Sequence, residues 1–144
     1  MFKIGFTGTR EGMTYSQIEW LDGAYRKAAE KYGPENIELH HGDCKGADAE
    51  AHEFATRHNI VTVIHPPDNQ KLRAYCRGDI ILPEKPYLER NLDIIEVCNV
   101  LIGMPRTGTP QERSGTWFTI LRAAKAGKPI RAVLPDGTLK TFNT

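Results

Sequence analysis

The sequence has few cysteines, no long apolar run and almost no excess of charge of either sign. Its three cysteines, Cys44, Cys76 and Cys98, are an odd number and form no C-x-x-C pair, which argues against a disulfide framework and a zinc ribbon. No apolar run approaches the ~20 residues that a membrane-spanning helix needs. A formal net charge of +1 disfavours a dedicated nucleic-acid binder without excluding a local basic patch, because such domains usually carry an excess of Lys and Arg.

The sequence also lacks the marks of a secretory signal and of a metal site. Residues 1–4 lead directly into a strand pattern, with no basic segment followed by a long apolar stretch, so we expect a cytoplasmic protein with no membrane partner. His40 and His41 near Cys44 match no usual ligand spacing and would alternate faces on a strand. We therefore expect no metal and no other resident cofactor. The length of 144 residues suits a single domain, residues 1–144.

Strand and helix patterns alternate along the whole chain. Apolar residues at helical spacing, with capping and stop signals, predict helices at residues 15–31, 47–58, 87–98 and 114–126. Short apolar or alternating runs predict strands at residues 3–7, 37–41, 59–65, 100–104 and 130–134, and a turn at 135–137 could fold 138–142 back as a short edge strand. Residues 66–86 contain four prolines and predict a long ordered loop, with a helical turn around 70–77 and basic residues that could cover an anion.

This alternation predicts an α/β fold with an open parallel sheet and helices on both faces. We expect a Rossmann-like three-layer sandwich with a mainly parallel five-stranded sheet in the order 3-2-1-4-5. In that order the first and fourth strands are neighbours where the strand order reverses, and ligands bind there, outside the carboxyl ends of the strands. The loops after these two strands should face each other across one crevice, with the loop after the second strand alongside.

The segment 97–126 contains the most informative of these loops. Ser114, Gly115 and Thr116 open a helix after the loop 105–113, and the free N–H groups and positive dipole end of a helix start suit a phosphate. Ser114 and Thr116 add hydroxyl donors, and Gly115 lets the backbone approach a ligand closely. The alternative is that Ser114 only caps the helix and Gly115 only relieves a tight turn.

The loops after the first and second strands also contain glycines and polar side chains. Arg10 could bind a phosphate through two parallel hydrogen bonds, or it could be a solvated surface residue. Asp43 and Asp48 would repel a phosphate, so a role in the pocket implies a ribose hydroxyl, a base edge or catalysis. Either aspartate could instead cap the following helix. Trp117 could stack on a nucleobase at the pocket rim, or it could simply pack beneath the loop.

The expected ligand-binding residues lie in these three loops and in the helix that precedes the fourth strand. They are Thr7, Gly8, Thr9, Arg10, Gly42, Asp43, Lys45, Gly46, Asp48, Arg90, Asn91, Pro105, Arg113, Ser114, Gly115, Thr116 and Trp117.

Five short motifs, in order along nearly the whole chain, resemble the SLOG superfamily. They are Gly8-Thr9-Arg10, Gly42-Asp43-x-x-Gly46-Ala47-Asp48 followed by Ala51-His52, Arg90-Asn91, Arg113-Ser114-Gly115-Thr116, and Gly127-Lys128-Pro129. That superfamily includes the Rossmann domain of DNA-processing protein A (Smf), the LOG phosphoribohydrolases and the small YspA/YpsA-like proteins, and the motifs resemble the YspA-like branch in particular. The resemblance implies a Rossmann-like fold that binds a nucleotide or nucleotide-derived ligand, with its phosphate at the turn 114–116 and at Arg10. Related proteins commonly pair, so a homo-oligomer is expected, with a dimer as the first guess.

The resemblance does not extend to a complete catalytic set. LOG proteins carry a P-G-G-x-G-T-x-x-E pattern whose Glu works on the glycosidic bond together with an upstream Arg; here Thr119 stands in the place of that Glu, whereas Arg90 matches the Arg. A threonine can neither stabilise an oxocarbenium-like centre nor activate water, so a hydrolase would need Asp43, Asp48 or Glu112 to supply the carboxylate.

We therefore expect a sensor or sequestering protein for a nucleotide-type small molecule. Two alternatives stay open: a nucleoside 5'-monophosphate N-glycosidase, and a protein that binds single-stranded DNA.

Overall fold

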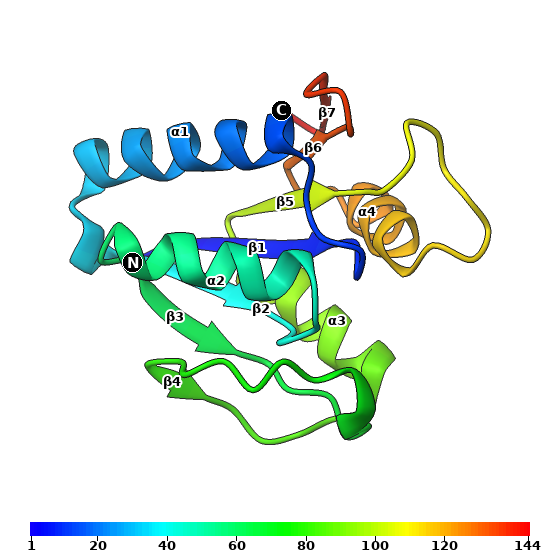
Figure 1. The fold of residues 1–144 in the computed structure, drawn as a ribbon, viewed down its shortest axis with the longest axis horizontal. Helices are drawn as coiled ribbons and strands as arrows, with labels where there is room; N and C mark the ends of the chain where they lie inside the picture. Colours follow the sequence, from blue (N-terminus) through cyan, green and yellow to red (C-terminus); the bar gives the residue numbers. More distant parts are fainter.

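A computed structural model describes residues 1–144 and contains one seven-stranded sheet with helices on both of its faces (Figure 1). The strands are β1 (Phe2–Gly8), β2 (Ile37–His41), β3 (Val61–Ile64), β4 (Ile80–Ile81), β5 (Val100–Met104), β6 (Ile130–Val133) and β7 (Leu139–Phe142). The α-helices are α1 (Tyr15–Tyr32), α2 (Ala47–Arg57), α3 (Tyr87–Val97) and α4 (Gly115–Lys125), and short 3-10 helices lie at Pro34–Asn36 and Gln70–Leu72.

The strand order is β4-β3-β2-β1-β5-β6-β7, and every neighbouring pair is parallel except β6 and β7. Its centre, β3-β2-β1-β5-β6, is the predicted order 3-2-1-4-5, and the predicted parallel sheet is confirmed. The possible edge strand is present as β7. The prediction of five main strands was too low, because β4 lies in the segment expected to be a loop; with two residues it has no sequence period, and it forms only through its pairing with β3.

Two helices cover each face of the sheet. On one face α1 and α2 pack over the central strands, in a cluster that includes Leu21, Tyr25 and Ala51. On the other face α3 and α4 pack in a cluster that includes Ile94 and Ile120. This arrangement is the expected three-layer sandwich. Side chains alternate between the faces along β5, where Leu101 belongs to the second cluster and Ile102 to the first.

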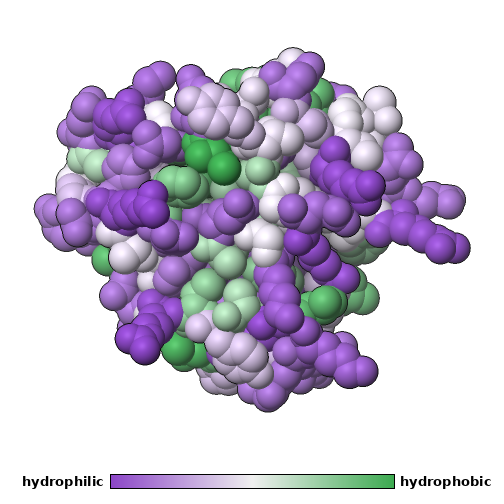
Figure 2. All heavy atoms as spheres, in the orientation of Figure 1, coloured by the Kyte–Doolittle hydropathy of each residue, from purple (hydrophilic) through white to green (hydrophobic).

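Neither the visible surface nor the helices are strongly apolar. On the side of the molecule seen in Figure 2, hydrophilic residues predominate and hydrophobic ones form small separate patches. None of the helices combines the length and the apolar character that crossing a bilayer would require.

The start of α1 is fixed to the end of the sheet where the site lies. Thr14 and Gln17 form a capping box, in which each side chain accepts a hydrogen bond from the other residue's N–H group. The amide nitrogen of buried Gln17 also donates to the carbonyl oxygens of Pro105 (2.9 Å) and Val133 (2.8 Å). One side chain therefore joins α1 to the carboxyl ends of β5 and β6.

Candidate ligand-binding site

The loops after β1, β2 and β5 meet at the carboxyl edge of the sheet. In Figure 1 the arrows of β1 and β5 point towards this edge, where α4 begins. The loops are joined by backbone hydrogen bonds from Thr9 N–H to the Met104 carbonyl (3.0 Å) and from Ala47 N–H to the Thr9 carbonyl (2.9 Å). At Gly46, which has a φ of +90°, a Cβ atom would collide with the backbone of Arg10. The β2–α2 loop can therefore pack directly on the β1–α1 loop.

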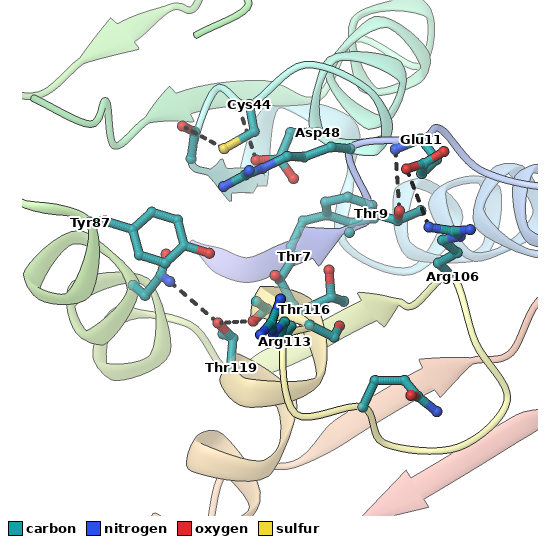
Figure 3. Close-up of a pocket in the computed structure, with 18 of the residues that line it drawn as sticks. Thr7, Thr9, Glu11, Cys44, Asp48, Tyr87, Arg106, Arg113, Thr116 and Thr119 are labelled. Carbon is teal, nitrogen blue, oxygen red and sulfur yellow. Dashed lines mark hydrogen bonds and ion pairs between the residues drawn. The ribbon is translucent and has the colours of Figure 1, made fainter. Parts of the chain in front are cut away.

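A cavity of about 880 Å³ lies between these loops. Its volume is within the ~300–1,000 Å³ that small-molecule sites usually have. In Figure 3 Cys44 and Asp48 lie on one side of the cavity and Arg113 and Thr116 on the other, with Thr7 between them. The expected residues that line it are Thr7, Gly8, Thr9, Arg10, Gly42, Asp48, Arg90, Asn91, Glu112, Arg113, Ser114, Gly115 and Thr116.

The N-terminus of α4 presents free donors to this cavity. The Ser114 hydroxyl accepts a hydrogen bond from Trp117 N–H (3.1 Å), so Ser114 caps the helix as one interpretation expected. The N–H groups of Gly115 and Thr116 donate to no other protein atom. The cap leaves two backbone donors and the positive end of the helix dipole available for an anion.

Arg90 is a buried cation that has no carboxylate partner. Its side chain, on α3, is 2% exposed and donates to the carbonyl oxygens of Gly42 and His65, the latter at 3.1 Å. Its Nε donates to the Asn91 side chain (2.8 Å), while Nη2 has only a 3.8 Å contact with the Cys44 sulfur. No acidic side chain lies within ion-pair distance. A buried charge of this kind is costly unless something compensates it.

Asp48 is the buried carboxylate of the cavity. It lies in the first turn of α2, is 5% exposed, and its Oδ2 accepts from Cys44 N–H (3.2 Å). The helix cap is Gly46, without a side-chain cap, so Asp48 does not have the capping role that was the alternative. Burial raises the pKa of Asp48 to about 6, and the positive charge of Arg90 limits this rise. Near neutral pH the carboxyl group can accept a hydrogen bond from a ligand hydroxyl, or exchange a proton with it.

Asp43 faces away from the cavity. Its φ of 57° is in the left-handed region, and its fully buried carboxylate accepts from Arg73 Nε (2.8 Å) and Cys76 N–H (2.9 Å). Its carbonyl also accepts from Ala74 N–H (2.7 Å). Asp43 therefore fastens residues 73–76 to the β2–α2 loop. The segment expected to form a basic cover is tied down at this point.

Four other expected ligand-binding residues shape the site without lining it. Trp117 is 1% exposed in the core between α3, α4 and the sheet, and its indole N–H contacts the carbonyl (3.2 Å) and hydroxyl (3.1 Å) oxygens of Thr107. The packing alternative therefore describes Trp117. Pro105 accepts the hydrogen bond from Gln17, Gly46 is the cap of α2, and Lys45 N–H donates to the Leu72 carbonyl (3.0 Å).

Several lining residues were not expected from the sequence. They are Phe6, Glu11, Cys44, Tyr87, Ile94, Arg106, Thr107, Gln111 and Thr119. Glu11 and Arg106, which form an exposed ion pair (3.4 Å), join two loops that are far apart in the sequence. Tyr87 lies one helical turn before Arg90, so both are on one face of the helix. This spacing could have identified Tyr87 as a lining residue from the sequence. A Cβ at Gly115 would come within 2.5 Å of the Tyr87 hydroxyl, so a larger residue there would displace the end of the Tyr87 side chain.

Thr119, which occupies the position of the Glu in the LOG sequence pattern, lines the cavity. Its hydroxyl donates to the Gly115 carbonyl (3.0 Å) and contacts the Asn91 side-chain amide (3.4 Å). Thr119 therefore links α3 to α4 and has its hydrogen-bonding capacity used within the protein.

Next to the cavity, two histidine pairs are buried at the end of β2. His40 contacts His65 (2.8 Å), and His41 contacts His52 (2.9 Å). The ligand atoms of His41, His52 and Cys76 lie within 4.8 Å of one another, a spacing that could suit a metal ion. However, His41 Nδ1 accepts from Asp43 N–H (3.0 Å), so its proton is on Nε2 and is donated to His52. In this structure the contact between His41 and His52 is therefore a hydrogen bond.

The molecule is thus a Rossmann-like α/β protein with a polar cavity at the carboxyl ends of its central strands. No model of a protein family matches the sequence, and no curated protein sequence matches it. Solved structures do share the fold. The molybdenum cofactor binding protein from the phototrophic bacterium Rippkaea orientalis has a TM-score of 0.71 and 19% identity, and the match covers 92% of this chain and 76% of that chain.

Two further structures from different organisms have the same fold. The molybdenum cofactor carrier protein of Chlamydomonas reinhardtii has a TM-score of 0.62 and 21% identity, over 92% of this chain and 75% of that chain. DNA processing protein A from Streptococcus pneumoniae has a TM-score of 0.60 and 20% identity, over 92% of this chain and 50% of that chain. The fold implied by the resemblance to the SLOG superfamily is confirmed, and one of the proteins named in that resemblance is among these neighbours. The expected dimer stays a prediction.

Proposed function

We propose that this protein binds a nucleotide or a related phosphorylated small molecule in the cavity and holds it without cleaving it, as a sensor or sequestering protein. The observation that carries the proposal is Arg90, a buried cation without a carboxylate partner, which lines the same cavity as the free N–H groups of Gly115 and Thr116. An anionic group in the cavity would compensate the buried charge and satisfy the backbone donors together.

The mixture of charges in the cavity favours a small ligand over a nucleic-acid strand. Arg10 and Arg113 line it together with Arg90, but so do Asp48 and Glu112. The arginines suit a phosphate, and the carboxylates suit hydroxyl or ring N–H donors of the same molecule. A site for single-stranded DNA would instead need a continuous basic track along the backbone.

Two further observations support binding without cleavage and widen the ligand class. Thr119 provides no carboxylate and is hydrogen bonded within the protein. Two of the structural neighbours are named for the molybdenum cofactor, whose organic part is a phosphorylated pterin. The class we propose is therefore a heterocycle joined to a phosphate, with nucleotides as its first members.

Thermal denaturation with a panel of nucleoside mono-, di- and triphosphates and phosphorylated pterins tests the proposal. A ligand at a hundred times its Kd should stabilise the folded protein by about 2.7 kcal/mol. Arg10→Ala removes a charged donor from the cavity, and loss of about 1.5–3 kcal/mol should weaken binding roughly 10- to 100-fold. Arg131→Ala, an exposed arginine on β6 outside the cavity, is the matched control. If no panel member stabilises the protein, or if both variants bind equally well, the proposal is wrong.

One observation supports a second candidate, nucleotide N-glycosidase activity. The Asp48 carboxyl lines the cavity with Arg90, and its pKa of about 6 is near the range in which a general acid or base works best. Incubation with nucleoside 5'-monophosphates and chromatography for free base decides between binding and cleavage. Base release that disappears in Asp48→Asn would establish cleavage, whereas no release by the unmodified protein would exclude it for those substrates.

A further inference from the structure

A second, smaller cavity adjoins the first. Its volume is about 180 Å³, and it lies between the segment 66–86 and the start of α3. Four of its lining residues, Arg10, Cys44, Tyr87 and Arg90, also line the main cavity, so the two spaces are neighbours. We call the smaller space the annex. It is below the ~300 Å³ at which small-molecule sites usually begin, so it suits part of a ligand.

The remaining walls of the annex differ in chemistry from those of the main cavity. They come from Pro67, Asn69 and Leu72, and with the ring of Tyr87 they form a largely apolar surface. Leu72 and Tyr87 are each 37% exposed, so their apolar side chains are accessible to a ligand. The Asn69 side-chain oxygen accepts from Lys71 N–H (3.1 Å), and its amide N–H₂ group has no protein partner. The annex therefore offers apolar walls and one polar edge.

The annex has a fixed wall even without a ligand. The Leu72 carbonyl accepts from Lys45 N–H (3.0 Å), and the next residue, Arg73, is held by the buried Asp43 carboxylate (2.8 Å). The Tyr87 side chain is held as well, since the Arg90 guanidinium lies 5.0 Å from the centre of its ring. A preformed gap of this kind binds a rigid planar group with little ordering cost.

We propose that the annex is the subsite for the planar heterocyclic ring of the ligand. The ring contacts Tyr87 on one side and Leu72 and Pro67 on the other, while the phosphate occupies the main cavity near Arg10 and the start of α4. This inference rests on the proposed function and adds the placement of the two ends of the ligand. It also makes the segment 66–86 the determinant of ring selectivity, because that segment supplies the walls that the main cavity does not share.

Substitution of Leu72 by Trp tests this placement, because the larger side chain fills the annex and leaves the main cavity unchanged. Binding of a nucleoside monophosphate and of ribose 5-phosphate is measured by calorimetry. Unmodified protein should bind the nucleotide about 5- to 150-fold more tightly than the sugar phosphate, since stacking contributes about 1–3 kcal/mol per base. Leu72→Trp should weaken nucleotide binding at least about fivefold and change ribose 5-phosphate binding less than twofold. Leu139→Trp, an exposed leucine on β7 at the other edge of the sheet, should change neither.

The possible results separate this inference from the proposed function. If unmodified protein binds neither compound, the proposed function fails and the inference with it. If both compounds bind equally tightly, or if Leu72→Trp leaves nucleotide binding unchanged, the phosphate site stands and the annex assignment is wrong. Circular dichroism checks the folding of Leu72→Trp; if that variant does not fold, Leu72→Ala is used, with an expected two- to tenfold loss that is confined to the nucleotide.

Discussion

Removal of the Arg73 side chain should destabilise the protein far more than removal of an ordinary surface arginine. The Asp43 carboxylate is fully buried, and Arg73 is its only ion-pair partner. Breaking a buried ion pair from one side leaves an uncompensated charge and costs about 3–5 kcal/mol. Because Cys76 N–H still donates to the carboxylate (2.9 Å), we expect the cost of Arg73→Ala to lie at the lower end of this range, about 3 kcal/mol. That is a large fraction of the ~5–15 kcal/mol by which domains are usually stable.

Urea denaturation followed by circular dichroism measures this cost. Arg77→Ala is the matched control, because Arg77 lies in the same segment, is exposed and forms no ion pair, so its loss should cost less than about 0.5 kcal/mol. The double variant Asp43→Asn with Arg73→Met should lose less free energy of unfolding than Arg73→Ala. No buried charge remains in it, and asparagine tolerates the left-handed φ of 57°. If Arg73→Ala and Arg77→Ala cost the same, Asp43 is not held as described and its assignment as a structural residue is wrong.

The remaining predictions concern pH and close packing. Burial lowers the pKa of His41 to about 3. Below about pH 6.5 the unfolded state therefore binds a proton at this residue that the folded state does not bind. The free energy of unfolding should fall by up to about 1.4 kcal/mol per pH unit as the pH is lowered from about 6.5 to about 3. Asp48, with its pKa raised to about 6, has the opposite effect between pH 6 and 3.8, so Asp48→Asn should make the acid loss steeper; an unchanged slope in urea titrations would contradict the burial of that carboxyl. Gly42→Ala would place a Cβ against the Arg90 guanidinium and should abolish measurable ligand binding by calorimetry, whereas Gly23→Ala, in open space within α1, should stabilise the protein by up to about 1 kcal/mol; equal binding by both variants would show that Arg90 does not contact the ligand.

The order of helices and strands follows from the sequence because it depends on local chemistry. Apolar spacing indicates which residues can form a helix or a strand, and the Thr14 and Gln17 pair marks the start of α1 through contacts three residues apart. Parallel strands that alternate with helices leave few possible arrangements, so the central sheet order and the edge at which the loops meet were also predictable.

Tertiary structure alone decided which polar residues of those loops face the cavity. Asp43 and Asp48 are five positions apart, and either could have been the carboxylate of the site. The left-handed backbone at Asp43 turns its side chain towards Arg73, thirty positions away, whereas Asp48, in the first turn of α2, lines the cavity. The same holds for β4, which exists only as a partner of β3. Local sequence sets which conformations a residue prefers. The burial of a side chain and the direction in which it points depend on contacts between segments distant in the chain, and a single sequence carries no record of those contacts.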